Sequence, residues 1–326
     1  MGEAVHVRMY RDEDLPAVLE LLRAALGESP LLLRTPQLFE WKHIDNPFGR
    51  SVMLVAEVDE TIVGLRAFMR WQLEYGADTI HCGRAVDTAT HPDYLRRGIF
   101  SRLTMEALDV ARDDGLQLMF NTPNERSRPG YLKMGWSDVG PIRVLVRPHP
   151  TRLIRGRHES TPGLDELAPV ATAIESGSAP PTEFGPWPPP DETLPTGLRT
   201  PRSNEYLTWR FGGHPTARYG AVVGSSGTAV VRANLRKGRS ELVISDALGP
   251  NPTEAVRSTI RTSGADYDVA AFPPGSPGRQ AARRSGMLPV PGVAALRLVA
   301  RPIGDLDIDV LNPTTWRLAL GDVELL

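Results

Sequence analysis

A strand-like segment that runs into a basic turn is the first part of the chain that could carry chemistry. Residues 86–90 alternate like a β-strand, and the turn that follows contains Arg96, Arg97 and Gly98 before a helical pattern begins. Successive backbone N–H groups in such a turn form an anion cradle, which the positive end of a helix dipole reinforces. The segment therefore predicts a pyrophosphate site, although taken alone it is also typical of an ordinary solvated helix start.

A second segment places a tyrosine a short distance further along. Residues 124–136 read Asn-Glu-Arg-Ser-Arg-Pro-Gly-Tyr-Leu-Lys-Met-Gly-Trp. A tyrosine hydroxyl, with a reference pKa of about 10, can donate a proton to a leaving group. An isolated tyrosine in such a helix is more often an aromatic side chain packed beneath a sheet. The spacing around Tyr131 is what gives the segment its functional interpretation.

Together the two segments resemble the signature motifs of the GNAT acyltransferase superfamily. Its pattern is a strand, a pyrophosphate loop of the type Arg/Gln-x-x-Gly-x-Gly/Ala, and then Asn-x-x-Ala-x-x-x-Tyr-x-x-x-Gly-Phe. The residues that fall on the second motif without a shift are Asn124, Ser127, Tyr131, Gly135 and Trp136. The first motif keeps Gly98 but has Leu95 in place of Arg or Gln and Phe100 in place of Gly or Ala. The resemblance covers about residues 5–147.

The resemblance implies an acyl-coenzyme A site, with acetyl-coenzyme A as co-substrate and no metal. Strands 85–90 and 116–120 would splay apart around the pantetheine arm, and the amides of Ala89 and Thr90 would stabilise charge on the thioester oxygen. Tyr131 would protonate the leaving thiolate, and Asn124 would orient the pantetheine or a bridging water. The residues implied to surround the coenzyme are Thr88, Ala89, Thr90, Leu95, Arg96, Arg97, Gly98, Ile99, Phe100, Ser101, Asn124, Ser127 and Tyr131.

The general base is left open by the sequence. An amine nucleophile must lose a proton, so carboxylate and imidazole groups are the candidates. These are Asp87, His91, His81 and the group Glu40, His43 and Asp45. The side chain of Asp87 should face the opposite side of the strand from its neighbours Val86 and Thr88. We take Asp87 as the third catalytic candidate beside Tyr131 and Asn124, with a structural role as the alternative.

The elements around these segments predict an α/β layer fold. A strand at 6–10 is followed by an acidic helix start and a helix that Gly27 closes. Two β-rich runs, 51–58 and 61–69, form a hairpin. The further expected elements are a strand at 85–90, a helix at 98–112, a strand at 116–120, a helix at 125–134 and a last strand at 139–146. This order predicts a mixed sheet with helices on its faces, of the α/β or α+β class.

The chain is long enough for two domains, and its prolines indicate where they separate. Of 326 residues, 30 are proline, and the stretch 180–201 is dense in them, which is typical of an extended linker. We expect a GNAT acyl-coenzyme A domain at 1–150, a linker region at 151–201, a second GNAT-like domain at 202–302 and a tail at 303–326.

The block after the linker echoes the first. Trp41-Lys42 and residues 47–50 correspond to Trp209-Arg210 and residues 215–218 at one constant spacing. At a second, shorter spacing, Pro123, Gly135 and Val139 correspond to Pro274, Gly286 and Val290, while Gly275 and Ala282 stand where the first copy has Asn124 and Tyr131. The pattern predicts a degenerate GNAT repeat without donor chemistry; the alternative is a coincidental match in an unrelated α/β domain.

Composition limits the partners. Lys plus Arg is 37 against 39 Asp plus Glu, a net charge of -2, which supplies no phosphate-neutralising surplus and argues against nucleic acid. The single cysteine, Cys82, cannot form an internal disulfide and lacks a zinc-type cluster around it. With neither a long apolar run nor a signal pattern, we expect a soluble cytoplasmic protein without a membrane partner.

The sequence as a whole predicts an acyl-coenzyme A-dependent N-acyltransferase, with acetyl as the expected group. It would move the acyl group to a small-molecule amine by direct attack. One alternative is a non-catalytic acyl-coenzyme A-binding or regulatory module, and another is an aminoacyl-type transferase on a tandem GNAT-like fold. The sequence leaves open the acceptor, the acyl length and the oligomeric state.

Overall fold

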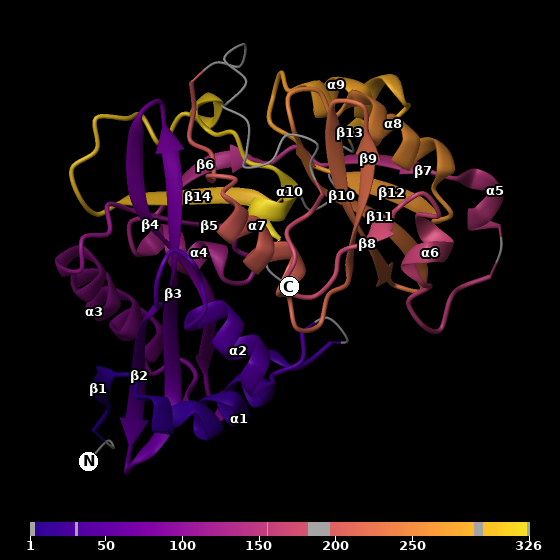
Figure 1. Cartoon of the computed structure of the whole chain (residues 1–326). Helices are drawn as coiled ribbons and strands as arrows, with labels where there is room; N and C mark the ends of the chain where they lie inside the picture. Colours follow the sequence, from indigo (N-terminus) through magenta and orange to yellow (C-terminus); the bar gives the residue numbers. More distant parts are fainter. Residues whose placement is uncertain (1–3, 30–31, 155, 182–195, 290–295, 325–326) are drawn as a thin grey trace. The chain divides into compact units, whose positions relative to one another are not determined.

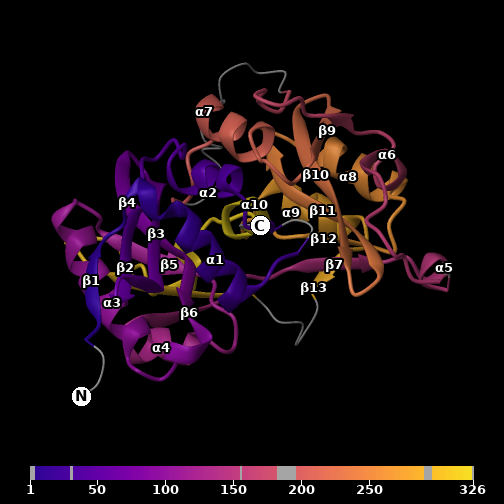
Figure 2. The same cartoon turned by 90° about the horizontal axis from the view of Figure 1, so that it is seen from below.

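The chain divides into two compact units that are interleaved along the sequence. The computed structural model describes residues 4–29, 32–154, 156–181, 196–289 and 296–324. The first unit comprises 1–140 and 297–313, and the second comprises 141–296 and 314–326. Each is built on one seven-stranded mixed sheet with helices (Figures 1 and 2). The predicted fold class, mixed α/β in two domains, is confirmed.

The sheet of the first unit has the strand order β1-β2-β3-β4-β5-β14-β6. Its strands are β1 (His6–Met9), β2 (Val52–Val58), β3 (Thr61–Tyr75), β4 (Asp78–Thr90), β5 (Leu118–Asn121), β6 (Ser137–Pro141) and β14 (Arg297–Pro302). Strands β1 to β4 are antiparallel neighbours, and β4 runs parallel to β5. The predicted β2–β3 hairpin is confirmed: Asp59 and Glu60 turn it with φ angles of 46° and 62°.

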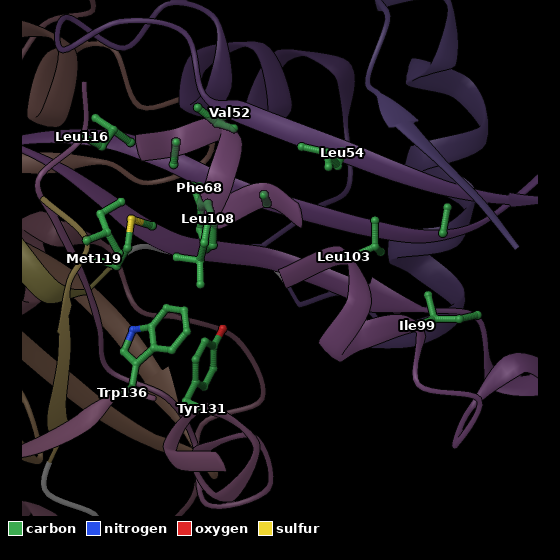
Figure 3. Close-up of a cluster of buried hydrophobic side chains, with 14 of the residues drawn as sticks. Val52, Leu54, Phe68, Ile99, Leu103, Leu108, Leu116, Met119, Tyr131 and Trp136 are labelled. Carbon is green, nitrogen blue, oxygen red and sulfur yellow. The ribbon is translucent and has the colours of Figure 1, made fainter. Parts of the chain in front are cut away.

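Helices cover both faces of this sheet. They are α1 (Leu15–Leu26), α2 (Pro36–His43), α3 (Ile99–Asp113) and α4 (Arg128–Lys133), with short 3-10 turns η1 (Asp12–Asp14) and η2 (Pro92–Tyr94). A further 3-10 turn, η4 (Pro313–Thr315), lies where the chain passes from the first unit to the second. On one face Leu22 and Phe39 of α1 and α2 pack against Leu65. On the other, Leu103 of α3 and Tyr131 of α4 pack with Phe68 (Figure 3). Helix α2 was not predicted, because only a short part of its sequence is apolar.

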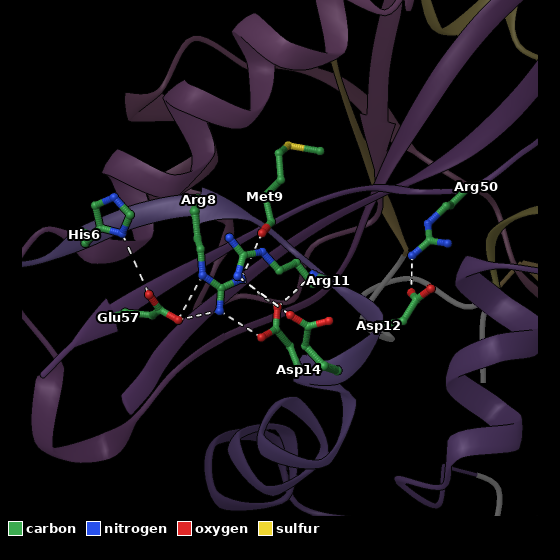
Figure 4. A network of polar contacts seen from close by, with 9 residues as sticks. His6, Arg8, Met9, Arg11, Asp12, Asp14, Arg50 and Glu57 are labelled. Atoms are coloured by element: carbon green, nitrogen blue, oxygen red, sulfur yellow. Dashed lines mark hydrogen bonds and ion pairs between the residues drawn. The ribbon is translucent and has the colours of Figure 1, made fainter. Parts of the chain in front are cut away.

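A partly buried ion pair fixes the first strand to the first helix. Arg8 of β1 donates two hydrogen bonds to the Asp14 carboxylate, at 2.7 and 2.8 Å, and one from Nε to Glu57 of β2 at 2.9 Å (Figure 4). Asp14 also accepts from the backbone N–H of Arg11 at 2.7 Å, which caps the start of the η1–α1 segment. The acidic helix start expected from the sequence is thus tied to the sheet.

The sheet of the second unit repeats the same plan, with the order β8-β9-β10-β11-β12-β7-β13. Its strands are β7 (Leu145–Pro148), β8 (Thr172–Ala173), β9 (Tyr219–Gly224), β10 (Gly227–Arg236), β11 (Arg239–Leu248), β12 (Tyr267–Ala270) and β13 (Leu288–Pro289). Its helical segments are α5 (Pro150–Leu153), α6 (Leu164–Leu167), α7 (Asn204–Leu207), the π-helical turn η3 (Thr208–Gly212), α8 (Thr253–Thr262), α9 (Pro277–Arg284) and α10 (Leu320–Val323). The fourth and fifth strands, β11 and β12, are again the parallel pair.

One strand in each sheet comes from the other half of the chain. Strand β14 lies between β5 and β6 of the first sheet, and β7 holds the same place between β12 and β13 of the second. The single strand expected at 139–146 is therefore wrong. Gly140, with φ of 133°, and Pro141, which lacks an N–H, end β6, and the chain then begins β7 in the second sheet. Because of this exchange, the limits of the two units differ from the domain ranges that we expect from the sequence.

Local geometry supports the predicted repeat around α4 and α9. Gly135 and Gly286 end the two helices with φ of 90° and 88°. The N–H of Trp136 donates to the Tyr131 carbonyl, and the N–H of Met287 donates to the Ala282 carbonyl, both at 3.1 Å. The connection that precedes α3 spans residues 91–98, whereas the one that precedes α8 spans only 249–252. The second copy therefore lacks the longer basic turn.

We predict that a chain ending at Arg147 aggregates. It lacks β14, so β5 and β6 lose their shared neighbour and expose unpaired strand edges, together with apolar surface that Val299 covers. Size-exclusion chromatography and circular-dichroism melting check this. The matched control fuses residues 296–313 to the shortened chain through a glycine-serine linker and should restore a monomer. A cooperative, monomeric melt of the shortened chain without that segment would contradict the prediction.

Candidate active site

The site is centred on a break in the pairing of β4. Strands β4 and β5 pair only from Cys82 with Leu118 to Arg84 with Phe120. Further along, the register of β4 with β3 shifts, and Asp87 takes a φ of 44° in a β-bulge. The following residues Thr88, Ala89 and Thr90 are therefore not paired with β5, and the edge of β4 that faces β5 is open at these positions. Such an edge is suited to an extended ligand arm that pairs like a strand.

The turn after β4 ends in a helix N-terminus. Gly98 is the N-cap of α3 with φ of 78°, and Arg96 before it has φ of 63°. The first intrahelical bond runs from the N–H of Arg102 to the carbonyl of Gly98. The N–H groups of the first turn, which includes Ile99, Phe100 and Ser101, have no acceptor within the helix. With the positive end of the helix dipole, they form an anion-binding geometry.

The side chains of this turn are mostly exposed. Leu95, Arg96 and Arg97 face solvent, and the Arg97 guanidinium lies 4.6 Å from the centre of the Tyr94 ring. Both arginines are therefore accessible to a phosphate, and their expected role toward the coenzyme stays a prediction. Phe100, which replaces a small residue of the family motif, directs its ring to Tyr131, with ring centres 5.9 Å apart.

Tyr131 lies at the bulge, on the face that α3 and α4 cover. It is 4% exposed and packs against Trp136 with ring centres 5.2 Å apart (Figure 3). Its phenolic oxygen accepts a hydrogen bond from Arg66 Nη1 at 3.0 Å, and the same nitrogen donates to Thr88 Oγ1 at 2.8 Å. Two of the predicted site residues, Tyr131 and Thr88, are thus brought together by an arginine that the sequence analysis did not single out.

Asn124 and Ser127 form the turn that starts α4. Asn124 Oδ1 accepts from the backbone N–H of Arg126 at 3.0 Å and of Ser127 at 2.9 Å, and also from the Ser127 hydroxyl at 3.1 Å. This Asx-type turn sets the direction of the helix that carries Tyr131. The oxygen of Asn124 is therefore engaged locally, and its expected role toward the pantetheine stays a prediction.

Asp87 lies on the opposite face of β4 in a buried ion cluster. Its carboxylate accepts from Arg34 Nη1 at 2.9 Å and Lys42 Nζ at 2.8 Å, and lies 3.1 Å from His43 Nε2. Burial alone would raise the pKa of Asp87, but the charge of Lys42, the His43 bond and Arg34 outweigh it and hold the pKa well below its usual value. A carboxylate held ionised by cations is a weak base, which favours the structural role.

The other candidate bases are dispersed. His43 is fully buried beside Asp87, and burial lowers the pKa of its imidazole. Glu40 and Asp45 are exposed, unlike the buried His43, and no contact joins the three side chains in the part of the chain that the structure describes. His91 Nδ1 accepts from the backbone N–H of Asp93 at 3.3 Å, as a turn residue does, and His81 is exposed.

The ion pair across the bulge recurs in the second unit. Arg202 Nε lies 2.8 Å from Asp246 Oδ2, and Arg202 also pairs with Asp322. A register shift between Val230 and Val231 of β10 marks a bulge at the same place in the fourth strand, β11. Arg34 and Arg202 are separated by the spacing that relates Trp41 to Trp209. The repeat spacing could therefore have drawn attention to Arg34 in the sequence. For Arg66, the available sequence signal was a single arginine within an apolar strand.

Within the residues that the structure describes, no cluster of three or more His, Cys, Asp or Glu side chains could hold a metal ion. No helix in the same described ranges has the length and apolar character needed to cross a membrane. Cys82 is buried as expected, and burial raises the pKa of its thiol well above the ordinary value.

The first unit is similar to a known protein family. Residues 6–139 match the family model of the acetyltransferase (GNAT) domain. No curated protein sequence matches the chain.

Solved structures show the same fold over most of the chain. A GCN5-related N-acetyltransferase from Kribbella flavida has a TM-score of 0.58 at 13% identity, covering 92% of this chain and 71% of its own. A probable N-acyltransferase from Enterococcus faecalis has 0.59 at 12%, covering 92% and 73%. Eis1 from Mycobacterium abscessus has 0.54 at 12%, covering 92% and 74%. At these identities the likeness concerns the fold.

We predict that Asp87→Asn destabilises the protein by about 3–5 kcal/mol, because it leaves Arg34 and Lys42 buried without their counter-charge. The contribution of Asp87 has a defined pH dependence: its folded-state pKa is depressed, so the stabilisation is complete above the unfolded pKa of about 3.9 and is lost as pH falls toward the folded one. Urea unfolding at several pH values measures both effects.

The control is Asp93→Asn, since this side chain is 83% exposed. It should change the unfolding free energy by less than about 0.5 kcal/mol. Equal stability of the Asp87 and Asp93 variants at neutral pH would show that the ion cluster does not hold the bulge.

Proposed function

Because residues 6–139 match the family model of the GNAT acetyltransferase domain, we propose that the protein transfers an acetyl group from acetyl-coenzyme A to the amine of a small molecule. The single observation that carries the proposal is the combination at β4: a bulged strand free of its parallel neighbour beyond Arg84, followed directly by a helix N-terminus. The first feature suits the pantetheine arm, and the second suits the pyrophosphate. The neutral overall charge of the chain favours a small acceptor over nucleic acid.

Backbone N–H groups near the end of β4 would act on the thioester by binding its carbonyl oxygen. Beyond the bulge, the N–H of Thr90 would face the thioester carbonyl, because the N–H of His91 donates to Val63 of β3 and the N–H of Ala89, two residues earlier, points to the same strand. When an amine attacks, negative charge develops on that oxygen, and fixed N–H donors stabilise it more in the transition state than in the ground state. The new C–N bond forms as the C–S bond breaks.

The leaving thiolate needs a proton, and Tyr131 would supply it. Because the phenolic oxygen already accepts from Arg66, the hydroxyl proton is directed elsewhere. Thr88, which also accepts from Arg66, would line the same pocket. Asn124 and Ser127 would serve this step by fixing the start of α4.

Asp87 would support the reaction through the shape of the strand. Its ion pairs with Arg34 and Lys42 stabilise the bulge and leave its pKa too low for proton abstraction. We propose that the acceptor amine reaches the site already neutral or releases its proton to solvent. The catalytic contribution of Asp87 is then to hold Ala89 and Thr90 in place.

The second unit would act as a scaffold. Ala282 holds the position of Tyr131, and the short connection before α8 leaves out the basic turn. Without the basic turn, a diphosphate would lack charge-assisted N–H contacts. Without the tyrosine, a leaving thiolate would lack a proton donor. We propose one coenzyme site per chain, in the first unit.

We predict that acetyl-coenzyme A raises the thermal stability of the full chain, since a ligand at about 100 times its Kd adds about 2.7 kcal/mol. Desulfo-coenzyme A should do nearly as much, because the pyrophosphate contacts are retained. Differential scanning fluorimetry and calorimetry check the effect and its stoichiometry. No shift at millimolar ligand would remove the donor assignment, and two equivalent sites would contradict the scaffold role of the second unit.

We predict that Tyr131→Phe lowers kcat by roughly 10²- to 10⁴-fold with donor affinity within a few-fold of native. Thiol release with a panel of amines is the measurement. Tyr219→Phe is the matched control, because Tyr219 is also buried and accepts from an arginine, Arg210, at 2.8 Å in the second unit. Unchanged turnover in the Tyr131 variant, with coenzyme still bound, would instead favour a non-catalytic acyl-coenzyme A-binding module.

A further inference from the structure

Arg66 is a charged residue buried within an apolar strand. It lies on β3 between Leu65 and Ala67, opposite the bulge of β4, and its relative exposure is 0%. The guanidinium carbon lies 4.4 Å from the ring centre of Phe68, 5.2 Å from Tyr131 and 5.7 Å from Phe100. Three aromatic rings therefore surround a side chain that normally needs water or a carboxylate.

The guanidinium is only partly satisfied. Nη1 donates to Thr88 and Tyr131, while Nε and Nη2 have no hydrogen-bond partner. In the part of the chain that the structure describes, no carboxylate forms an ion pair with Arg66. Two other buried arginines have a carboxylate partner: Arg34 pairs with Asp87, and Arg232 pairs with Glu324. A buried charge without a counter-charge lowers the stability of the folded protein. We therefore expect the charge of Arg66 to have a role in function.

We propose that Arg66 is a positioning residue that directs the proton of Tyr131 toward the departing sulfur and pairs with the tyrosinate that remains. The inference rests on the proposed function and extends it to a residue outside the family motifs matched above. Arg66 acts through Tyr131, because its nitrogens are sealed from solvent and reach the reacting atoms only by way of the phenol.

The proton balance of the step explains why an unpaired cation is useful. The amine forms the C–N bond, the C–S bond breaks, and the thiolate takes the proton of the Tyr131 hydroxyl. The resulting tyrosinate lies within hydrogen-bond distance of Arg66 Nη1, so the buried cation gains the counter-charge that it lacks at rest. The amine releases one proton to solvent, and the tyrosinate takes up one proton from solvent, so the number of protons is conserved over the cycle.

Attraction between unit charges is several times stronger in a protein interior than in water. An interaction that forms only after proton transfer stabilises the later state more than the ground state, which is the condition for a larger kcat. Burial lowers the pKa of Arg66, but a guanidinium keeps its charge in proteins. The aromatic rings make that charge tolerable at rest.

The test is a set of four variants of the full chain: Arg66→Met, Arg66→Lys, Tyr131→Phe and the double variant. Thiol release gives kcat and KM, and calorimetry gives acetyl-coenzyme A affinity. We expect Arg66→Met to lower kcat by about 10²-fold with KM and donor affinity within a few-fold of native. Arg66→Lys, which restores a charge, should recover at least about tenfold of that loss.

The double variant separates action through Tyr131 from an independent effect. If Arg66 works through the phenol, the double variant should be no slower than Tyr131→Phe alone. Multiplicative losses, a Met variant as active as native, or a Lys variant no better than Met would each overturn the proposal. Should the Met variant misfold, the comparison of Arg66→Lys with native and with Tyr131→Phe decides.

A control addresses general loss of stability. Arg232→Met removes another fully buried arginine, in the second unit, and should leave kcat within a few-fold of native. Failure of this inference is distinguishable from failure of the proposed function: a native chain that neither binds coenzyme nor releases thiol overturns the function, whereas native turnover with an unaffected Arg66→Met variant overturns only the role of Arg66.

Discussion

The bulge at Asp87 is the constraint on which the first unit depends. A residue with φ of 44° inside a strand is strained, and the ion pairs from Arg34 and Lys42 hold it there. Within the bulge, the side chains of Asp87 and Thr88 lie on opposite faces of the sheet and have different surroundings. One face receives a saturated ion cluster, and the other receives the Arg66–Tyr131 pair. The exposed edge of β4 and the direction of the turn into α3 follow from the same break.

Comparison of the two units separates architecture from chemistry. The arginine–aspartate pair and the strand bulge occur in both, so they belong to the fold. The basic turn and the tyrosine occur only in the first unit, where Ala282 is the counterpart of Tyr131. The two charged side chains of the first unit also differ in their surroundings: Asp87 is in contact with Arg34, Lys42 and His43, while Arg66 has no carboxylate partner among the residues that the structure describes.

Much of the fold and part of the site could be predicted from the sequence, because helices such as α1 and α3 have clear apolar spacing and the motif around Tyr131 is local. Arg34 and Arg66 could not be assigned in this way, since their partners lie far away in sequence and only the folded sheet brings them to the bulge. The strand exchange was also missed. The alternation of apolar and polar residues is similar before and after Gly140 and Pro141, and the local sequence does not indicate which sheet a strand will join.

The exchanged strands impose an order on biosynthesis. Strand β5 leaves the ribosome long before β14, its antiparallel neighbour, so the first sheet stays open while the whole second unit is made. Chains grow by about 5–20 residues per second, and during that interval the edge of β5 has to be kept from pairing with other chains. The two units therefore mature together rather than one after the other, and chaperone occupancy should persist on nascent chains until residues 297–302 emerge.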